Sequence, residues 1–145
     1  MKVVLFQPEI PQNTGNIART CAATRTPLCL IRPLGFSLSD RYLKRAGLDY
    51  WQELQLEILD EFILPAAPTY FLSSKASQSY SDVSFSPDST LVFGSETSGL
   101  PSFFHENYAS QFITIPMAPG LRSLNLSNAV AIVLYEALRQ NKFSF

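Results

Sequence analysis

The sequence is poor in the residues that build metal centres and disulfide frameworks. It has one histidine, His105, and two cysteines, Cys21 and Cys29, in 145 residues. Both cysteines stand among apolar neighbours, which is typical of reduced core residues. So few soft ligands also argue against a structural zinc site. We therefore expect neither a disulfide nor a bound metal ion.

Long apolar runs and a large net charge are also missing. No apolar run approaches the roughly 20 residues of a membrane span, and the apolar residues 3–6 meet Gln7 and Pro8 too early for a signal peptide. The net charge of −1 argues against a general nucleic-acid coat. We expect one domain over residues 1–145, in the cytoplasm and without membrane contact.

The charges that are present are segregated along the chain. Six cations and one acid lie between Arg19 and Arg45, whereas five acids and no cation lie between Asp49 and Glu61. Such segregation lets one face meet phosphate while the whole chain stays near neutral. An accidental cluster on a solvated surface explains the same pattern, so both interpretations stay open at this point.

Short apolar runs alternate with segments that carry helix signals. Strands are expected at residues 3–6, 28–31, 69–72, 91–93 and 112–115. Helices are expected from a cap at Asn13 or Thr14 to about Thr24, and over residues 39–45, 101–107 and 125–140. Residues 54–59 suit a strand or a helix, and residues 75–89 suit a loop. This alternation predicts an α/β fold, with a mainly parallel sheet and helices on both faces.

The last expected helix is apolar over more than one stripe. Ile132 and Tyr135 widen the surface formed by Leu126, Val130 and Val133. A helix of this kind favours contact with a second chain as well as with its own sheet.

Residues 8–20 form the first of three segments whose residues suggest a functional role more than a purely structural one. A proline-rich loop leads into a helix start that bears amides and, one turn later, Arg19. Helix N-termini bind anions, and an arginine adds a bidentate phosphate contact. Plain helix capping beside a surface arginine is the alternative.

Residues 91–101 form the second segment, in which a strand runs into Gly94. A glycine there permits close approach of a ligand to the backbone. No Gly-Lys-Ser/Thr follows, which argues against nucleoside triphosphate chemistry. The absence of Gly-x-Ser-x-Gly argues against a hydrolase built on Ser98 and His105. Glu96 suits a cap for the amides of the following turn, or a ligand contact.

Residues 113–128 form the third segment, which leaves a strand, passes two prolines and a glycine and enters the last helix. Four small polar residues crowd around that entry: Ser123, Asn125, Ser127 and Asn128. One would suffice as a cap. The excess indicates that loop backbone groups, or a ligand, need partners.

Four stretches in this order resemble the SPOUT methyltransferases, specifically the SpoU-type tRNA ribose 2′-O-methyltransferases. They are Pro8 to Arg19, Arg45 to Tyr50, Phe93 to Pro101 and Ile115 to Val130. The match covers nearly the whole chain and is similar to the short subgroup that methylates the wobble nucleotide of the anticodon, a cytidine or a modified uridine. The segment 60–68 is shorter than the helix usual there.

The resemblance implies a C-terminal deep trefoil knot, a homodimer, S-adenosylmethionine as cofactor and the anticodon stem-loop of tRNA as partner. The cofactor positions carried over by motif are Leu72, Gly94, Ile115, Ser123, Met117 and Leu124. The catalytic positions are Arg19 and Asn125, and Glu96 falls on the glutamate of the middle motif. Contact with RNA is expected from Arg19, Lys44, Arg45 and Arg122. Without an added RNA-binding domain, RNA docking is expected on the dimer surface.

Three other functions compete with this interpretation. One is a SPOUT enzyme acting on ribosomal RNA or on another tRNA position, because the motifs bind the cofactor and the ribose and indicate little about which RNA is the substrate. Another is a non-catalytic RNA-binding protein of the same fold, which the presence of Arg19, Glu96, Ser123 and Asn125 disfavours. A dinucleotide oxidoreductase is disfavoured because no Gly-x-Gly-x-x-Gly follows the first strand.

Overall fold

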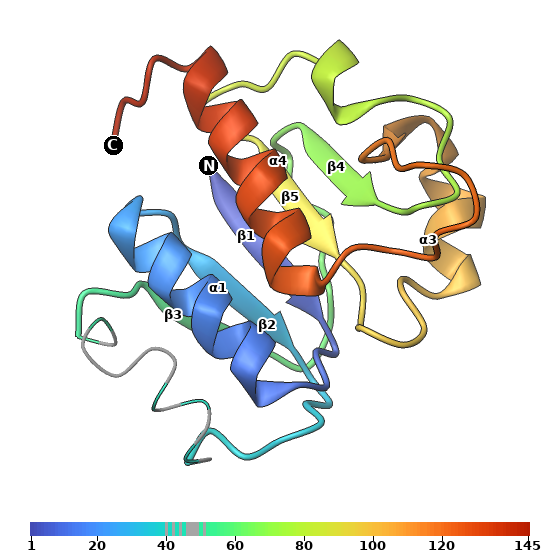
Figure 1. The fold of residues 1–145 in the computed structure, drawn as a ribbon. Coiled ribbons are helices and arrows are strands. Elements are labelled where there is room, and N and C mark those ends of the chain that lie inside the picture. Colours follow the sequence, from blue (N-terminus) through green and yellow to red (C-terminus); the bar gives the residue numbers. More distant parts are fainter. Residues whose placement is uncertain (40, 42, 44, 46–49, 51) are drawn as a thin grey trace.

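The computed structural model describes residues 1–39, 41, 43, 45, 50 and 52–145. Within these residues a six-stranded sheet has the order β3-β2-β1-β5-β4-β6, and every pairing is parallel (Figure 1). The strands are β1 (Lys2–Phe6), β2 (Leu28–Ile31), β3 (Leu56–Leu59), β4 (Thr69–Leu72), β5 (Thr90–Phe93) and β6 (Phe112–Ile113). The predicted α/β class with a parallel sheet is confirmed.

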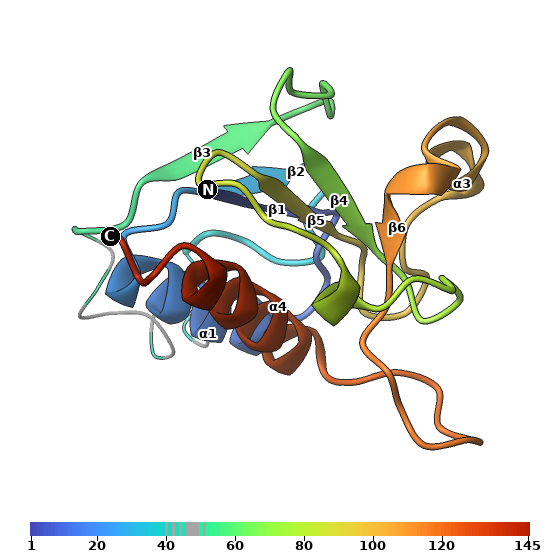
Figure 2. The same cartoon turned by 90° about the horizontal axis from the view of Figure 1, so that it is seen from above.

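Helices cover the two faces of the sheet unequally. α1 (Pro11–Ala23) and α4 (Leu126–Gln140) lie side by side on one face, and the short α3 (Ser102–Asn107) lies against the other (Figure 2). Two 3₁₀ turns, η2 (Tyr80–Asp82) and η3 (Ala109–Gln111), complete the described elements.

Alternate strand residues supply two separate hydrophobic cores. Val3, Leu5 and Leu91 pack in the core that includes Val130 and Leu134 of α4. The intervening residues face α3, in a core formed by Val4, Cys29, Ile31, Phe71, Val92, Leu100, Phe104 and Phe112. Because successive side chains point to opposite faces, a strand buried on both faces reads as a continuous apolar run.

The chain changes direction between β1 and β5, which are neighbours in the middle of the sheet. From β1 the connections lead outward to β2 and β3, whereas from β5 they lead the other way to β6. In open parallel sheets, ligands bind beyond the carboxyl ends of the strands at such a switch point. The loops that follow these strands are therefore the expected place for a functional site.

Several element boundaries differ from expectation. α1 begins at Pro11, so Asn13 and Thr14 lie inside the helix and neither caps it. Proline suits the first helical position because its φ is already helical and its missing N–H is not needed there. β6 ends at Ile113, two residues before the expected end. Residues 56–59 form a strand, and residues 60–68 form no helix.

The expected helix over residues 39–45 lies partly outside the described residues, because positions 40, 42 and 44 are not among them. Arg41, Leu43 and Arg45 are helical. The final helix, expected over residues 125–140, is confirmed, with Asn125 as its N-cap.

Both cysteines are buried and free, as expected of core residues. Burial raises the pKa of the Cys21 thiol to about 12 and also raises that of Cys29, because a thiolate would lose its hydration there. Across the described ranges, no helix is long and apolar enough to cross a membrane. The same ranges hold no group of three or more residues suited to bind a metal ion.

The core on the α3 face depends on Phe71, whose side chain is fully buried. We expect Phe71→Ala to lower the free energy of unfolding by about 3–5 kcal/mol, because it removes a large apolar side chain and leaves a cavity. Phe103→Ala is the matched control, since Phe103 is 56% exposed, and it should cost less than about 1 kcal/mol. Urea unfolding followed by circular dichroism measures both. Equal losses would contradict this account of the core.

Candidate functional site

Three adjacent strands, β5, β4 and β6, end at the same edge of the sheet. Leu72 at the end of β4 pairs with Phe93 and with Ile113. The loop after β4 then runs beside the exit of β6: the Ser73 N–H donates to the Ile113 carbonyl at 3.0 Å, and the Thr114 N–H donates to the Gln78 carbonyl at 2.8 Å. This arrangement brings Leu72, Gly94 and Ile115 to one edge.

Gly94 begins a tight turn that closes on itself. The Gly99 N–H donates to the Ser95 carbonyl at 3.0 Å, and the Ser95 N–H donates to the Gly99 carbonyl at 3.3 Å. A Cβ atom on Gly94 would lie 2.1 Å from the Gly99 carbonyl carbon. In this structure, the backbone that closely approaches Gly94 is that of Gly99, in the same turn.

Glu96, in the same turn, contacts the loop after the neighbouring strand β1 and the first turn of α1. Its carboxylate accepts hydrogen bonds from the Glu9 N–H at 2.7 Å, the Ile10 N–H at 3.0 Å and the Asn13 side-chain amide at 3.2 Å. The expectation that Glu96 caps the turn that follows it was wrong. Glu96 thereby supplies the carboxylate for the backbone N–H groups of Glu9 and Ile10, the two residues just before α1.

A reciprocal contact strengthens the same junction. The Glu9 carboxylate accepts from the Thr97 hydroxyl at 2.8 Å and from the Thr97 N–H at 3.3 Å. The loops after β1 and β5 therefore exchange hydrogen bonds in both directions at the switch point of the sheet.

Asn125 joins the third segment to this junction. Its side-chain oxygen accepts from the Ser127 N–H at 2.9 Å, the Ser127 hydroxyl at 2.6 Å and the Asn128 N–H at 3.4 Å, which caps α4. Its amide donates to the Asn13 side-chain oxygen at 2.9 Å. A continuous chain of side chains, Glu96, Asn13 and Asn125, thus links all three segments that the sequence singled out.

The other cofactor positions lie around the same edge. Ile115 is half-buried and packs against the α4-side core, and Met117 is half-buried. Ser123 and Leu124 lie in the exposed loop before α4, and Leu124 is 38% exposed. Of this group, only Ile115 packs against a described hydrophobic core.

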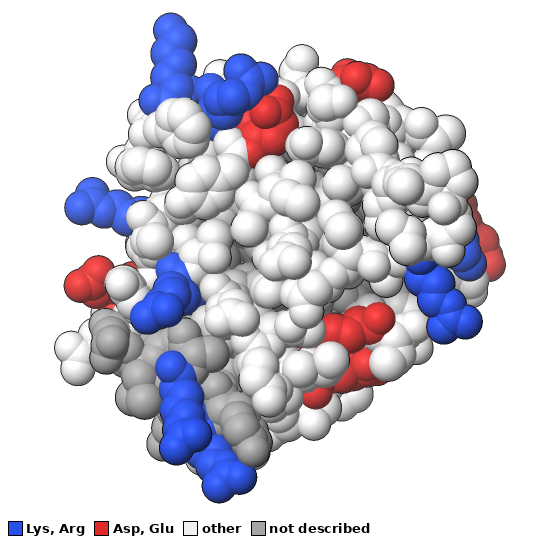
Figure 3. Space-filling view, in the orientation of Figure 1, with Lys and Arg blue, Asp and Glu red and all other residues white. Residues whose placement is uncertain are grey.

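The expected RNA contacts are dispersed. Arg19 is exposed on α1, with its guanidinium carbon 5.2 Å from the centre of the Tyr50 ring. Arg45 and Arg122 are exposed, and Lys44 lies outside the described residues. Figure 3 shows cations toward the edges of the face formed by α1 and α4, and few charged side chains in its middle.

Sequence reasoning missed Asn13, Glu9 and Thr97 as members of the junction. Each had an ordinary local explanation, as a cap or as a loop residue. Their partners lie 83 to 112 residues away, so no local spacing indicates these pairings.

The parallel sheet, with its motif loops meeting at one carboxyl edge, matches the fold of solved methyltransferases of the SpoU type. The model of the SpoU rRNA Methylase family matches residues 1–135, and the chain belongs to this family.

Similar proteins cover nearly the whole chain. A Listeria monocytogenes protein named "Putative tRNA (cytidine(34)-2'-O)-methyltransferase" is 50% identical, over 97% of this chain and 88% of that protein. The tRNA (cytidine(34)-2'-O)-methyltransferase of Methylovorus glucosotrophus is 45% identical, over 98% and 96%. A solved structure described as "Structural insights into the 2-OH methylation of C/U34 on tRNA" is 46% identical, with a TM-score of 0.92 over 97% of this chain and 95% of that one.

Because Glu96 accepts three N–H groups, Glu96→Gln should destabilise the protein by about 1.5–3 kcal/mol. The substitution replaces one acceptor oxygen by an NH₂ group that faces backbone donors. Glu9→Gln is the matched control, since its remaining oxygen still accepts from Thr97, and it should cost under about 1 kcal/mol. Urea unfolding compares the two. Glu96→Gln as stable as the parent protein would contradict the role given to this carboxylate.

Proposed function

We propose that this protein transfers a methyl group from S-adenosylmethionine to the ribose 2′-hydroxyl of nucleotide 34 of tRNA, a cytidine or a modified uridine. The chain of hydrogen bonds from Glu96 through Asn13 to Asn125 carries the proposal, since it unites the three motif segments at a ligand-binding edge. The names of relatives at 45–50% identity support the choice of RNA.

The residues at this edge fit the proposed cofactor. Leu72, Ile115 and Met117 leave part of their apolar surface accessible at the carboxyl ends of β4 and β6, which suits an adenine ring. Ser123 and the backbone groups of the loops provide polar contacts for the ribose and the amino acid portion. When bound, S-adenosylmethionine supplies a methyl group that is already activated on a sulfonium.

With an activated donor, the chain has mainly to position the acceptor oxygen and to stabilise its charge. Asn125 is held by Asn13 and faces the reacting ribose in this proposal. We assign Arg19 to the phosphate next to the ribose and to the developing alkoxide charge. A guanidinium keeps its proton at neutral pH, so stabilisation suits Arg19 better than proton abstraction does.

A second copy of the chain completes the proposed enzyme. Ile132 and Tyr135 on α4 are 36% and 47% exposed, and Phe143 and Phe145 beyond it are 45% and 61% exposed. α4 lies on the face that carries few charged side chains in its middle (Figures 1 and 3). Dimerisation would bury this surface and join the cations of two copies, including Arg45 and Arg122, into one surface for the anticodon stem-loop.

We further infer that residues 1–145 form one domain with a knotted C-terminal part, and that the protein works in the cytoplasm, where tRNA is modified. The backbone bonds between residues 73–80 and 113–114 support the knot. They hold the loop after β4 beside β6, from which the chain runs on to α4, the helix that packs against α1.

Methylation of purified tRNA with labelled cofactor, followed by mapping of the modified nucleotide, tests the proposed function. Label on the 2′-oxygen of nucleotide 34 is expected. Label at another tRNA position, or on ribosomal RNA alone, would overturn the proposed substrate and leave methyl transfer standing. No binding of S-adenosylmethionine in calorimetry would instead favour a non-catalytic RNA-binding protein.

Arg19→Ala should abolish methyl transfer while leaving the affinity for S-adenosylmethionine within about twofold, because the residue contacts RNA and not the cofactor in this proposal. A turnover assay on tRNA and calorimetry with the cofactor measure the two effects. Lys142→Ala, just beyond α4 and outside the cation stretch from Arg19 to Arg45, is a control for the loss of one positive charge, and it should retain turnover. Activity of Arg19→Ala near that of the parent protein would overturn the assignment.

Tyr135→Glu should convert the dimer to a monomer, since it places a charge within the apolar surface of α4. Ile63→Glu is the control, because Ile63 is 77% exposed between β3 and β4, and it should remain dimeric. Analytical ultracentrifugation gives the masses. A monomeric parent protein, or a dimeric Tyr135→Glu variant, would contradict this interface.

A further inference from the structure

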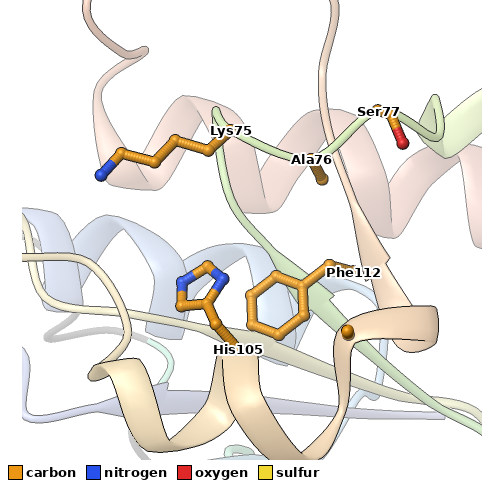
Figure 4. Close-up of a pocket in the computed structure, with 6 residues that line it drawn as sticks. Lys75, Ala76, Ser77, His105 and Phe112 are labelled. Atoms are coloured by element: carbon orange, nitrogen blue, oxygen red, sulfur yellow. The ribbon is translucent and has the colours of Figure 1, made fainter.

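A pocket of about 230 Å³ lies between the loop after β4 and the α3–β6 connection (Figure 4). It is lined by Lys75, Ala76, Ser77, His105, Ala109 and Phe112. None of these residues belongs to the proposed cofactor positions or to the chain from Glu96 to Asn125. The pocket therefore needs a separate explanation.

One wall of the pocket is the end of a stack of three rings. The His105 imidazole lies on the Phe112 ring, with centroids 4.1 Å apart and planes 20° apart. Phe112 in turn stacks on Phe71, at 5.3 Å and 23°. Phe71 and Phe112 are buried in the α3-side core, whereas His105 is half-buried. The imidazole is thus the outermost ring of a platform that the core holds rigid, and it loses little freedom when a ligand stacks on it.

A cation stands at the other side of the same pocket. The Lys75 side chain extends from the loop after β4 above the His105 ring (Figure 4). Lys75 is exposed, and its ammonium forms no hydrogen bond or ion pair with any residue the structure describes. An unpaired ammonium beside an aromatic platform suits a ligand with a flat ring and a negative group.

The residues of the pocket are near the proposed cofactor positions in sequence. They lie, however, on the opposite side of the sheet. Lys75 follows Leu72 by three residues, and Phe112 precedes Ile113 in β6. Phe112 packs in the α3-side core, however, whereas Ile113 packs in the core that includes α4. Alternation along β6 thus places the pocket and the α4 face on different sides of one strand.

We propose that this pocket binds an unpaired nucleotide of the RNA substrate other than the one that is methylated, with its base on His105 and its phosphate on Lys75. Unpaired bases in RNA loops stack on aromatic side chains, histidine included, and lysine binds phosphate as a point charge. The inference rests on the proposed function in that the substrate is an RNA loop.

The probe is an anticodon stem-loop RNA with cytidine at position 34, whose affinity is measured by fluorescence anisotropy at several salt concentrations. We expect His105→Ala to weaken binding at least about fivefold, as loss of a stacked base does. His105→Phe keeps an aromatic ring and should bind within about twofold of the parent protein. The contrast between these two variants separates stacking from a structural role of the position.

Lys75→Gln should weaken binding and should lower the slope of log affinity against log salt by about 1, because one phosphate contact is lost. Lys142→Gln is the matched control. It removes one exposed positive charge just beyond α4, near the C-terminus. The C-terminus lies on the side of the molecule away from α3 (Figures 1 and 2). This control should bind the RNA as the parent protein does.

Two further measurements keep this inference distinct from the proposed function. Calorimetry with S-adenosylmethionine should give the same affinity for all four variants, and weaker binding in His105→Ala or Lys75→Gln would assign the pocket to the cofactor and overturn the inference. Methylation of nucleotide 34 by the parent protein tests the function itself. If that methylation occurs while His105→Ala and Lys75→Gln bind the stem-loop unchanged, the function stands and the pocket is not an RNA site.

Discussion

The carboxylate of Glu96 is the interaction on which the functional edge of this protein depends. The loops after β1 and β5 meet at the switch point of the sheet, where backbone N–H groups point into a crowded junction. Glu96 accepts two of these N–H groups and the amide of Asn13. Without this acceptor, partly buried donors would lack partners, which costs more than an ordinary hydrogen bond contributes.

Further hydrogen bonds connect this junction to α4. Asn13 is buried on α1 and uses both ends of its amide, one toward Glu96 and one toward Asn125. Asn125 then caps α4 with its remaining oxygen. One amide thus fixes the position of Glu96 in the β5 loop relative to Asn125, because both of its ends are hydrogen-bonded.

The parallel sheet separates two kinds of surface. On the side of α1 and α4, alternate strand residues support a long helix that exposes the apolar side chains of Ile132 and Tyr135. On the other side, α3 is short, and stacked rings connect the buried Phe71 to the half-buried His105. This second surface is rigid because its outermost ring rests on the core, which favours recognition by stacking at low entropic cost.

Elements with local signals follow directly from the order of the amino acids. Apolar runs at residues 3–6, 28–31 and 69–72 form strands, because buried parallel strands need apolar residues on both faces. Asn125 caps α4 because a short amide at the start of a helix bonds to N–H groups only two and three residues away. The order of the four motif stretches along the chain likewise indicates the family.

Three features of the site depend instead on tertiary packing: the partners of Glu96, the need for glycine at position 94 and the side chains that face the pocket at His105. Each arises from contacts between segments far apart in the chain or from the closure of a turn. Local propensity carries no information about a partner 83 residues away. That partner is selected by strand order and register, which arise from packing of the whole sheet.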